Sequence, residues 1–162
     1  MPGAPFAIEG AMTPLRVNGE HVELDVEPRR TLLDALRADL GLTGAKKACD
    51  MGNCGACTVL LDGEAVYSCL VLAVDCVARA VTTIEGLGEG GKLHRLQEAF
   101  IAADAFQCGF CTPGQLMALA ALFERVARPS DAQIMRALSG NLCRCGAYQN
   151  ILRAARMVRD RK

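Results

Sequence analysis

Nine cysteines in a chain of 162 residues are several times the usual share of this amino acid, so the thiols have a role that packing alone does not require. Eight of them form two groups of four. Thiols grouped in this way either pair as disulfides or bind metal. The first group is Cys49, Cys54, Cys57 and Cys69, with the spacing C-x4-C-x2-C-x11-C, and the second is Cys108, Cys111, Cys143 and Cys145, a C-x2-C pair followed by a C-x-C pair.

The start of the chain bears on the choice between disulfides and metal. A secreted disulfide-linked protein normally begins with a positively charged stretch and an apolar segment, and residues 1–15 (MPGAPFAIEGAMTPL) contain neither. Arg29-Arg30 lies too far along the chain to serve as a twin-arginine export signal. We therefore expect a reducing cytoplasm, where clustered cysteines bind metal or react more often than they form disulfides.

The first group of cysteines predicts a [2Fe-2S] cluster. Its first three members follow the loop spacing of plant-type ferredoxins. Because each iron of such a cluster takes two thiolates, a tight loop supplies three sulfurs and Cys69, from a nearby strand end, supplies the fourth. Gly52 and Gly55 let the loop turn and let backbone N–H groups approach the sulfurs, where they stabilise negative charge.

The second group adjoins two predicted helix starts. Thr112-Pro113 follows the C-x2-C pair and opens a helix at Gly114, and residues 146–148 follow the C-x-C pair and open the last helix. Helix N-termini favour anions, so a dianionic cluster is well placed there. The sequence predicts a second [2Fe-2S] cluster, held between two helical hairpins.

Other interpretations suit these residues less well. A four-cysteine zinc site uses similar C-x2-C pairs, but the x4 and x11 gaps and the C-x-C pair fit it poorly. A thiol redox motif needs a thioredoxin-like βαβ setting, which QCGFCTPG lacks. Cys76, in the apolar run LVLAVDCVA, is predicted to be a packed small hydrophobe. His21 and His94 have no second ligand nearby and are expected to be solvated surface residues.

The elements that position the first site are predicted to form a small mixed sheet with one packed helix, an α+β arrangement. Two strand pairs flank the turn signals Asn18-Gly19 and Asp62-Gly63. Thr31 is the predicted N-cap of the helix TLLDALRADL, and Gly41 follows its end. The expected strands are residues 15–17, 21–26, 58–61, 64–68 and 81–84.

A glycine-rich connection, EGLGEGGK at residues 85–92, separates the two halves. Residues 86–91 also fit the pattern G-x-G-x-x-G, but no second parallel strand follows to complete a dinucleotide-binding unit. Beyond this connection the apolar period changes to that of a helix. Four helices are expected, at residues 93–103, 114–126, 130–138 and 148–158, with Ser130 as an N-cap.

Charge and hydropathy narrow the classes of partner. The formal net charge is zero, but residues 1–85 hold seven basic and twelve acidic side chains and residues 86–162 hold eleven and six. Two clusters of charge about −2 each would make the loaded protein acidic. The basic residues are scattered and few aromatics are available for stacking, so no nucleic acid is expected. No run approaches the roughly 20 apolar residues of a membrane span, so we expect a soluble protein.

Four segments together resemble the small [2Fe-2S] subunit of the molybdenum hydroxylases, the xanthine dehydrogenase and aldehyde oxidoreductase family. They are CDMGNCGACTVLLDGEAVYSCL, VTTIEGL, QCGFCTPGQLM and LSGNLCRCGAYQNI, and the resemblance runs from about residue 15 to residue 156. It implies an N-terminal ferredoxin-like β-grasp domain, residues 12–85, followed by a C-terminal four-helix-bundle [2Fe-2S] domain, residues 86–162. The segment CRCGAY, where many relatives read CRCTGY, is closer to the aldehyde and isoquinoline oxidoreductase branches.

The resemblance also implies partners. It implies a complex of three chains or fused domains, expected as a heterotrimer or a dimer of heterotrimers, with a large subunit that holds molybdenum and molybdopterin, as the cytosine dinucleotide, and a medium subunit that holds FAD. An aldehyde or N-heteroaromatic substrate is oxidised at molybdenum, and single electrons pass through both clusters to FAD. The cluster of the second group lies nearer molybdenum. Gln107 matches a position that hydrogen-bonds the pterin, and Cys145 lies near the pterin amino group.

This chain is therefore expected to be an enzyme subunit without a substrate site of its own. The alternative is a free-standing ferredoxin-like electron shuttle. The feature that discriminates between them is the helical second half, which a mobile ferredoxin does not need.

Overall fold

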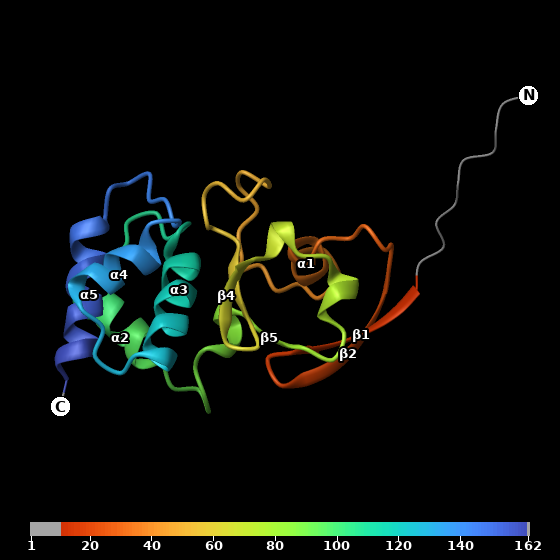
Figure 1. Ribbon diagram of the computed structural model, residues 1–162, viewed down its shortest axis with the longest axis horizontal. Coiled ribbons are helices and arrows are strands. Elements are labelled where there is room, and N and C mark those ends of the chain that lie inside the picture. The colour runs from red at the N-terminus through yellow and green to blue at the C-terminus, as the bar shows by residue number, and fades with distance from the viewer. Residues whose placement is uncertain (1–10, 162) are drawn as a thin grey trace, which may run out of the picture.

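The structure is a computed structural model that describes residues 11–161. One five-stranded sheet and five α-helices make up a mixed α/β fold, with helices α2 to α5 gathered beside strand β4 and the β1–β2 hairpin at the far side of the sheet (Figure 1). The expectations for residues 1–10, including the absence of an export signal there, lie outside the described part. The strands are β1 (Ala11–Val17), β2 (Glu20–Val26), β3 (Thr58–Leu61), β4 (Glu64–Tyr67) and β5 (Ala80–Thr82). The helices are α1 (Leu32–Asp34), α2 (Arg95–Ala102), α3 (Thr112–Arg125), α4 (Asp131–Leu138) and α5 (Tyr148–Asp160).

The strand order is β2-β1-β5-β3-β4, with β1 and β5 parallel and the other neighbours antiparallel. Both predicted hairpins are confirmed, and Asn18 and Gly19 have the positive φ values, 52° and 85°, that their two-residue turn requires. The Asn18 side chain also accepts a hydrogen bond from the backbone N–H of Thr83 at 2.8 Å. It thereby ties the first hairpin to the end of β5. The predicted last strand, 81–84, extends too far, because β5 ends at Thr82 and Ile84 starts the 3-10 turn η4 (Ile84–Gly86).

The first helix begins as predicted but ends differently. The Thr31 hydroxyl accepts a hydrogen bond from the backbone N–H of Asp34 at 3.1 Å, which confirms it as the N-cap. After α1 the chain widens into a π-helical turn, η1 (Ala35–Asp39), in which the N–H of Leu40 donates to the carbonyl of Ala35. The expectation of one regular α-helix to Leu40 is therefore wrong. Its apolar face is nonetheless buried, and Leu32, Leu33 and Leu36 lie in the core under the sheet.

The four helices of the second half pack on one another: α2 contacts α3 and α5, and α4 contacts the same two helices. Ser130 caps α4 as predicted, and its hydroxyl accepts a hydrogen bond from the N–H of Gln133. His94 is not the solvated residue that we expected. Its Nδ1 accepts a hydrogen bond from the N–H of Leu96 at 3.2 Å, and its own N–H donates to the side chain of Gln97 at 2.8 Å, so it is the N-cap of α2.

The sheet and the helices share a core. Leu60 of β3 belongs to the apolar cluster of the second half, and α3 packs on β3 and β4. A salt bridge of 2.7 Å joins Arg125 of α3 to Glu64 of β4. None of the described helices has the length and apolar character that a bilayer crossing demands.

The histidine cap predicts that stability depends on pH. Burial lowers the pKa of His94, and the charge of Arg95 acts in the same direction. The neutral ring is the form whose Nδ1 accepts the cap hydrogen bond. Its folded pKa therefore lies below the unfolded value of about 6.5, so the stabilisation is complete above that value and is lost as pH falls through the folded pKa. His94→Asn, which caps without titrating, should lose less stability than the wild type between about pH 7.5 and pH 5.5. The difference should be several tenths of a kcal/mol because the ring is partly exposed, and thermal melts at the two pH values would measure it. Equal losses in both proteins would contradict this prediction.

Candidate metal centres

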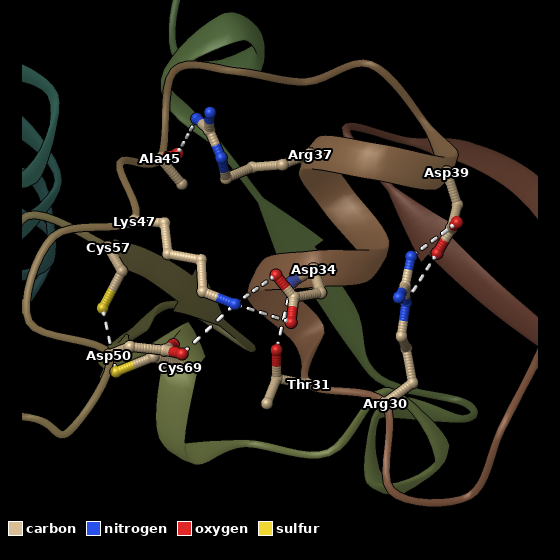
Figure 2. A network of polar contacts seen from close by, with 10 residues as sticks. All are labelled: Arg30, Thr31, Asp34, Arg37, Asp39, Ala45, Lys47, Asp50, Cys57 and Cys69. Carbon is tan, nitrogen blue, oxygen red and sulfur yellow. Dashed lines mark hydrogen bonds and ion pairs between the residues drawn. The ribbon is translucent and has the colours of Figure 1, made fainter.

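The structure brings the first group of cysteines together as two sulfur pairs. The Sγ atoms of Cys57 and Cys69 lie 3.4 Å apart, and both residues are buried (Figure 2). The thiols of Cys49 and Cys54 interact with each other on the more exposed side. A pair of sulfurs for each of two metals is what a binuclear cluster requires.

Backbone N–H groups of the loop approach the exposed Cys49 sulfur, as its glycines predicted. The N–H of Asn53 donates to Cys49 Sγ at 3.2 Å. Hydrogen bonds from the N–H groups of Met51 and Asn53 lower the pKa of the Cys49 thiol to about 7. On the other side, burial raises the pKa of Cys57 to about 12. The loop therefore stabilises a thiolate at its exposed side, whereas the buried side needs a metal to displace the proton.

Helix α1 holds this loop in place through charged side chains. Lys47 Nζ lies 2.9 Å from Asp34 and 3.1 Å from Asp50, so it bridges the helix and the cysteine loop (Figure 2). The hydrogen bond from Lys47 lowers the pKa of Asp34. Arg37 donates to the carbonyls of Thr43 at 2.9 Å and Ala45 at 2.8 Å, which fixes the approach to the loop.

The second group also forms two pairs, drawn from the segments that precede α3 and α5. Cys108 and Cys145 have their Sγ atoms 3.4 Å apart. The thiols of Cys111 and Cys143 interact with each other, and Cys143 is buried. The adjacent helix starts are confirmed: Cys111 is the N-cap residue of α3, and Ala147 is the N-cap residue of α5.

The second site repeats the electrostatic pattern of the first. The backbone N–H of Phe110 lowers the pKa of the exposed Cys108, and burial raises the pKa of Cys111 to about 12. Burial opposes ionisation of Cys143 as well, but N–H donors led by that of Ala147, 3.4 Å from its Sγ, lower its pKa. The Tyr148 hydroxyl accepts a hydrogen bond from the N–H of Cys143 at 2.8 Å.

Of the remaining predicted residues, Gln107 is exposed beside Cys108, and Cys145 is partly exposed. Cys76 is fully buried with its Sγ 3.5 Å from the carbonyl of Leu72, and burial raises its pKa, which confirms the interpretation as a packed residue. Within residues 11–161 no three His, Cys, Asp or Glu side chains converge on a point that could hold a single metal ion.

Polar residues that sequence analysis missed join the two sites. Asn141 Nδ2 donates to the carbonyl of Gly55 at 2.9 Å and to the hydroxyl of Thr58 at 3.0 Å, and the Gln115 amide donates to the carbonyl of Asn141 at 2.7 Å. The Tyr67 hydroxyl donates to the carbonyl of Gly140 at 3.0 Å. Asn141 and Gln115 are buried. Their position next to the cysteine motifs could have suggested structural hydrogen bonds, but it does not identify the partners.

One backbone hydrogen bond connects the cysteine segments directly. The N–H of Leu142 donates to the carbonyl of Cys54 at 2.9 Å, and Cys143 is the next residue after Leu142. A cavity of about 390 Å³ lies at the same place, and its walls include cysteines of both groups. The two sites are therefore neighbours across the junction of sheet and helices.

Two families of [2Fe-2S] proteins match the chain. The 2Fe-2S iron-sulfur cluster binding domain matches residues 15–80, and the [2Fe-2S] binding domain matches residues 83–156. The fold and the two sites thus define a protein with two [2Fe-2S]-binding domains.

Curated relatives and solved structures are more specific. The aldehyde oxidoreductase iron-sulfur-binding subunit PaoA of Escherichia coli is 46% identical over 95% of this chain and 74% of its own length. The nicotinate dehydrogenase small FeS subunit of Eubacterium barkeri is 44% identical over 91% of this chain and 94% of its own length. The crystal structure of quinoline 2-oxidoreductase from Pseudomonas putida matches with a TM-score of 0.87 and 42% identity, covering 91% of both chains.

This chain therefore belongs to the family of small iron-sulfur subunits of molybdenum hydroxylases, electron-transfer subunits of oxidoreductase complexes. The aldehyde oxidoreductase of Desulfovibrio gigas has the same fold, with a TM-score of 0.87 at 36% identity over 92% of this chain. The match covers only 17% of that chain, so in this relative the two domains are part of a much longer polypeptide.

A pair of glycine variants tests how tightly the first site packs against the helices. A Cβ at Gly55 would lie 2.5 Å from the carbonyl oxygen of Gly140 and 2.7 Å from Asn141 Nδ2, whereas a Cβ at Gly63 would meet nothing within 4 Å. Both residues have positive φ, 69° and 83°. Gly63→Ala should cost only the backbone penalty of roughly 1–2 kcal/mol. Gly55→Ala should cost clearly more and lower the iron content. Similar melting temperatures for the two variants would contradict this.

A pair of asparagine variants tests the buried amide. Asn141→Ala removes two buried hydrogen bonds, while the Gly55 carbonyl keeps those from the N–H and the hydroxyl of Thr58, so we expect a loss of about 1–3 kcal/mol in the free energy of unfolding. Asn150, which donates to the carbonyl of Asp104 at 2.9 Å in a more exposed place, is the matched control. Asn150→Ala should cost less than about 1 kcal/mol. Thermal or denaturant melts would compare them, and an equal cost would refute the structural importance of the amide.

Proposed function

We propose that this chain relays single electrons from a molybdopterin site on a large subunit to FAD on a medium subunit. The observation that carries this proposal is the contact between the two cysteine segments, the hydrogen bond of 2.9 Å from Leu142 N–H to the carbonyl of Cys54. It gives two neighbouring one-electron sites a short route through bonded atoms and one hydrogen bond. When bound, the [2Fe-2S] clusters supply one-electron chemistry.

The sulfur pairs support an assignment of ligands to individual irons. Cys49 with Cys54 and Cys57 with Cys69 would hold the two irons of the first cluster, because each pair is already in contact. Cys108 with Cys145 and Cys111 with Cys143 would hold those of the second. The chain contributes N–H donors to Cys49, Cys108 and the buried Cys143, and it buries Cys57 and Cys69, which together would set the potentials and limit access of water.

The exposed sides of the two sites support the orientation of the relay. Gln107 and Cys108 are exposed together at the second site, where we place the molybdopterin, as the cytosine dinucleotide. Gln107 would hydrogen-bond the pterin, with Cys145 near its amino group. At the first site Met51 and Leu70 are each 64% exposed, and we place the FAD-binding subunit on this side.

The names of the relatives support the remaining assignments. We propose a heterotrimer in a reducing cytoplasm, in keeping with nine free thiols, that oxidises an aldehyde or an N-heteroaromatic compound. No substrate site is placed on this chain. We divide it into a ferredoxin-like β-grasp domain, residues 12–85, and a four-helix-bundle domain, residues 86–162, and the family matches at 15–80 and 83–156 support this division.

Purification of the tagged chain with its natural partners tests the proposal. We expect about four iron and four acid-labile sulfide per chain, two EPR signals after reduction, and co-purification of molybdenum and FAD. Cys54→Ser should remove one signal, whereas Cys76→Ala, at a buried cysteine outside both groups, should keep both. Two signals without molybdenum or FAD partners would favour the free-standing shuttle, and zinc in place of iron would refute both functions.

A further inference from the structure

The cavity between the two cysteine groups has one cationic wall residue. Arg144, an exposed residue, stands between the ligand candidates Cys143 and Cys145 and lines this cavity of about 390 Å³. The other wall residues are cysteines, aliphatic side chains and aromatic rings. They are Ala48, Cys54, Ala56, Cys108, Phe110, Cys111, Leu142, Cys143 and Tyr148.

Most other arginines of the chain are already paired. Arg30 pairs with Asp39 at 2.8 Å, Arg125 with Glu64 at 2.7 Å, and Arg156 and Arg159 with Asp131 at 2.8 and 2.6 Å. Within residues 11–161, Arg144 has neither a carboxylate partner nor a hydrogen bond. Its charge is therefore not neutralised locally by the protein.

We propose that Arg144 is a tuning residue that raises the reduction potentials of both clusters through its charge in this cavity. The inference rests on the proposed function, since it presupposes two clusters. Each site of four thiolates and an oxidised [2Fe-2S] core carries a charge of about −2, and reduction makes it more negative. A neighbouring cation stabilises the reduced form more than the oxidised form, and solvent at the exposed Arg144 screens this effect without removing it.

The charge of Arg144 acts on both clusters, because cysteines of both groups line the cavity. Cys54 of the first group and Cys108, Cys111 and Cys143 of the second all line it. Arg144 follows Cys143 and precedes Cys145 in the chain, and both cysteines are candidate ligands of the second cluster. The reduction potential of the second cluster should therefore shift more than that of the first. A guanidinium stays protonated throughout the usual pH range, so the effect does not require titration. The cation also offsets the repulsion between the two anionic sites, so that reduction of one cluster opposes reduction of the other less strongly.

Redox titration of the purified complex, followed by EPR, tests the proposal. At the wild-type midpoint potential of the second cluster, Arg144→Met should lower the reduced-to-oxidised ratio about tenfold, which is 59 mV for one electron. The first cluster should shift in the same direction by about threefold. Arg144→Lys should remain near the wild type, because it keeps the charge. Arg136→Met, which removes the same charge from an exposed position on α4 outside the cavity, should change either ratio less than twofold.

A variant with added charge covers the case in which Arg144→Met fails to assemble. Leu142, 55% exposed, lines the same cavity, so Leu142→Lys should raise both potentials and Leu142→Met should not. Potentials that stay at wild-type values in Arg144→Met, or that stay unchanged in Leu142→Lys, would overturn the proposal. A shift in Arg144→Lys as large as that in Arg144→Met would assign the effect to packing and overturn it as well. Iron content separates this failure from failure of the proposed function, because a chain with four iron and unchanged potentials contradicts the tuning role alone.

Discussion

The side-chain amide of Asn141 donates both of its hydrogens across the junction between the sheet and the helices, to the carbonyl of Gly55 and the hydroxyl of Thr58. Gly55 is the residue after one cysteine of the first group, and Asn141 is two residues before a cysteine of the second, so this contact sets how the two metal centres face each other. The amide is 4% exposed, and its donors therefore have no access to water as an alternative partner. The backbone packs closely around this amide, since a Cβ added at Gly55 or at Gly114 would lie 2.7 or 3.1 Å from Asn141 Nδ2. Together with the Tyr67–Gly140 and Leu142–Cys54 hydrogen bonds and the Arg125–Glu64 salt bridge, this buried contact fixes the sheet against the helices.

Each centre combines one exposed thiol whose pKa backbone N–H groups lower with one more enclosed thiol whose pKa burial raises. Cys49 and Cys57 show the contrast in the first centre, and Cys108 and Cys111 show it in the second. Metal uptake must therefore release protons from the buried side, and the exposed side is already prepared for it. The same asymmetry leaves one side of each centre accessible to an electron donor or acceptor and shields the other from water.

Much of this architecture could be predicted from local sequence. The hairpins at Asn18-Gly19 and Asp62-Gly63 depend on residues that tolerate the positive φ of a two-residue turn. The caps at Thr31 and Ser130 depend on side chains that bond within a few residues. The cysteine groups were readable because metal chemistry constrains their spacing. The role of His94 as an N-cap was not predicted, because its sequence context does not distinguish a capping histidine from a surface histidine. The contacts of Asn141, Gln115 and Tyr67 depend on partners far along the chain, and no local pattern encodes such partners. The π-helical turn closes locally, from Leu40 to Ala35, but the apolar spacing of the segment does not distinguish it from an α-helix.

The parallel pairing of β1 with β5 has a consequence for synthesis on the ribosome. The first strand finds this neighbour only after residues 80–82 have emerged, and the contact of Leu142 with Cys54 needs the chain to be almost complete. Contacts so distant in sequence form late because closing long loops is entropically costly. Newly made chains thus pass through a stage in which the thiols of the first loop are out of the exit tunnel before the helices that cover their flank exist. The flank of the first cysteine loop is therefore covered only after the last part of the chain has been made.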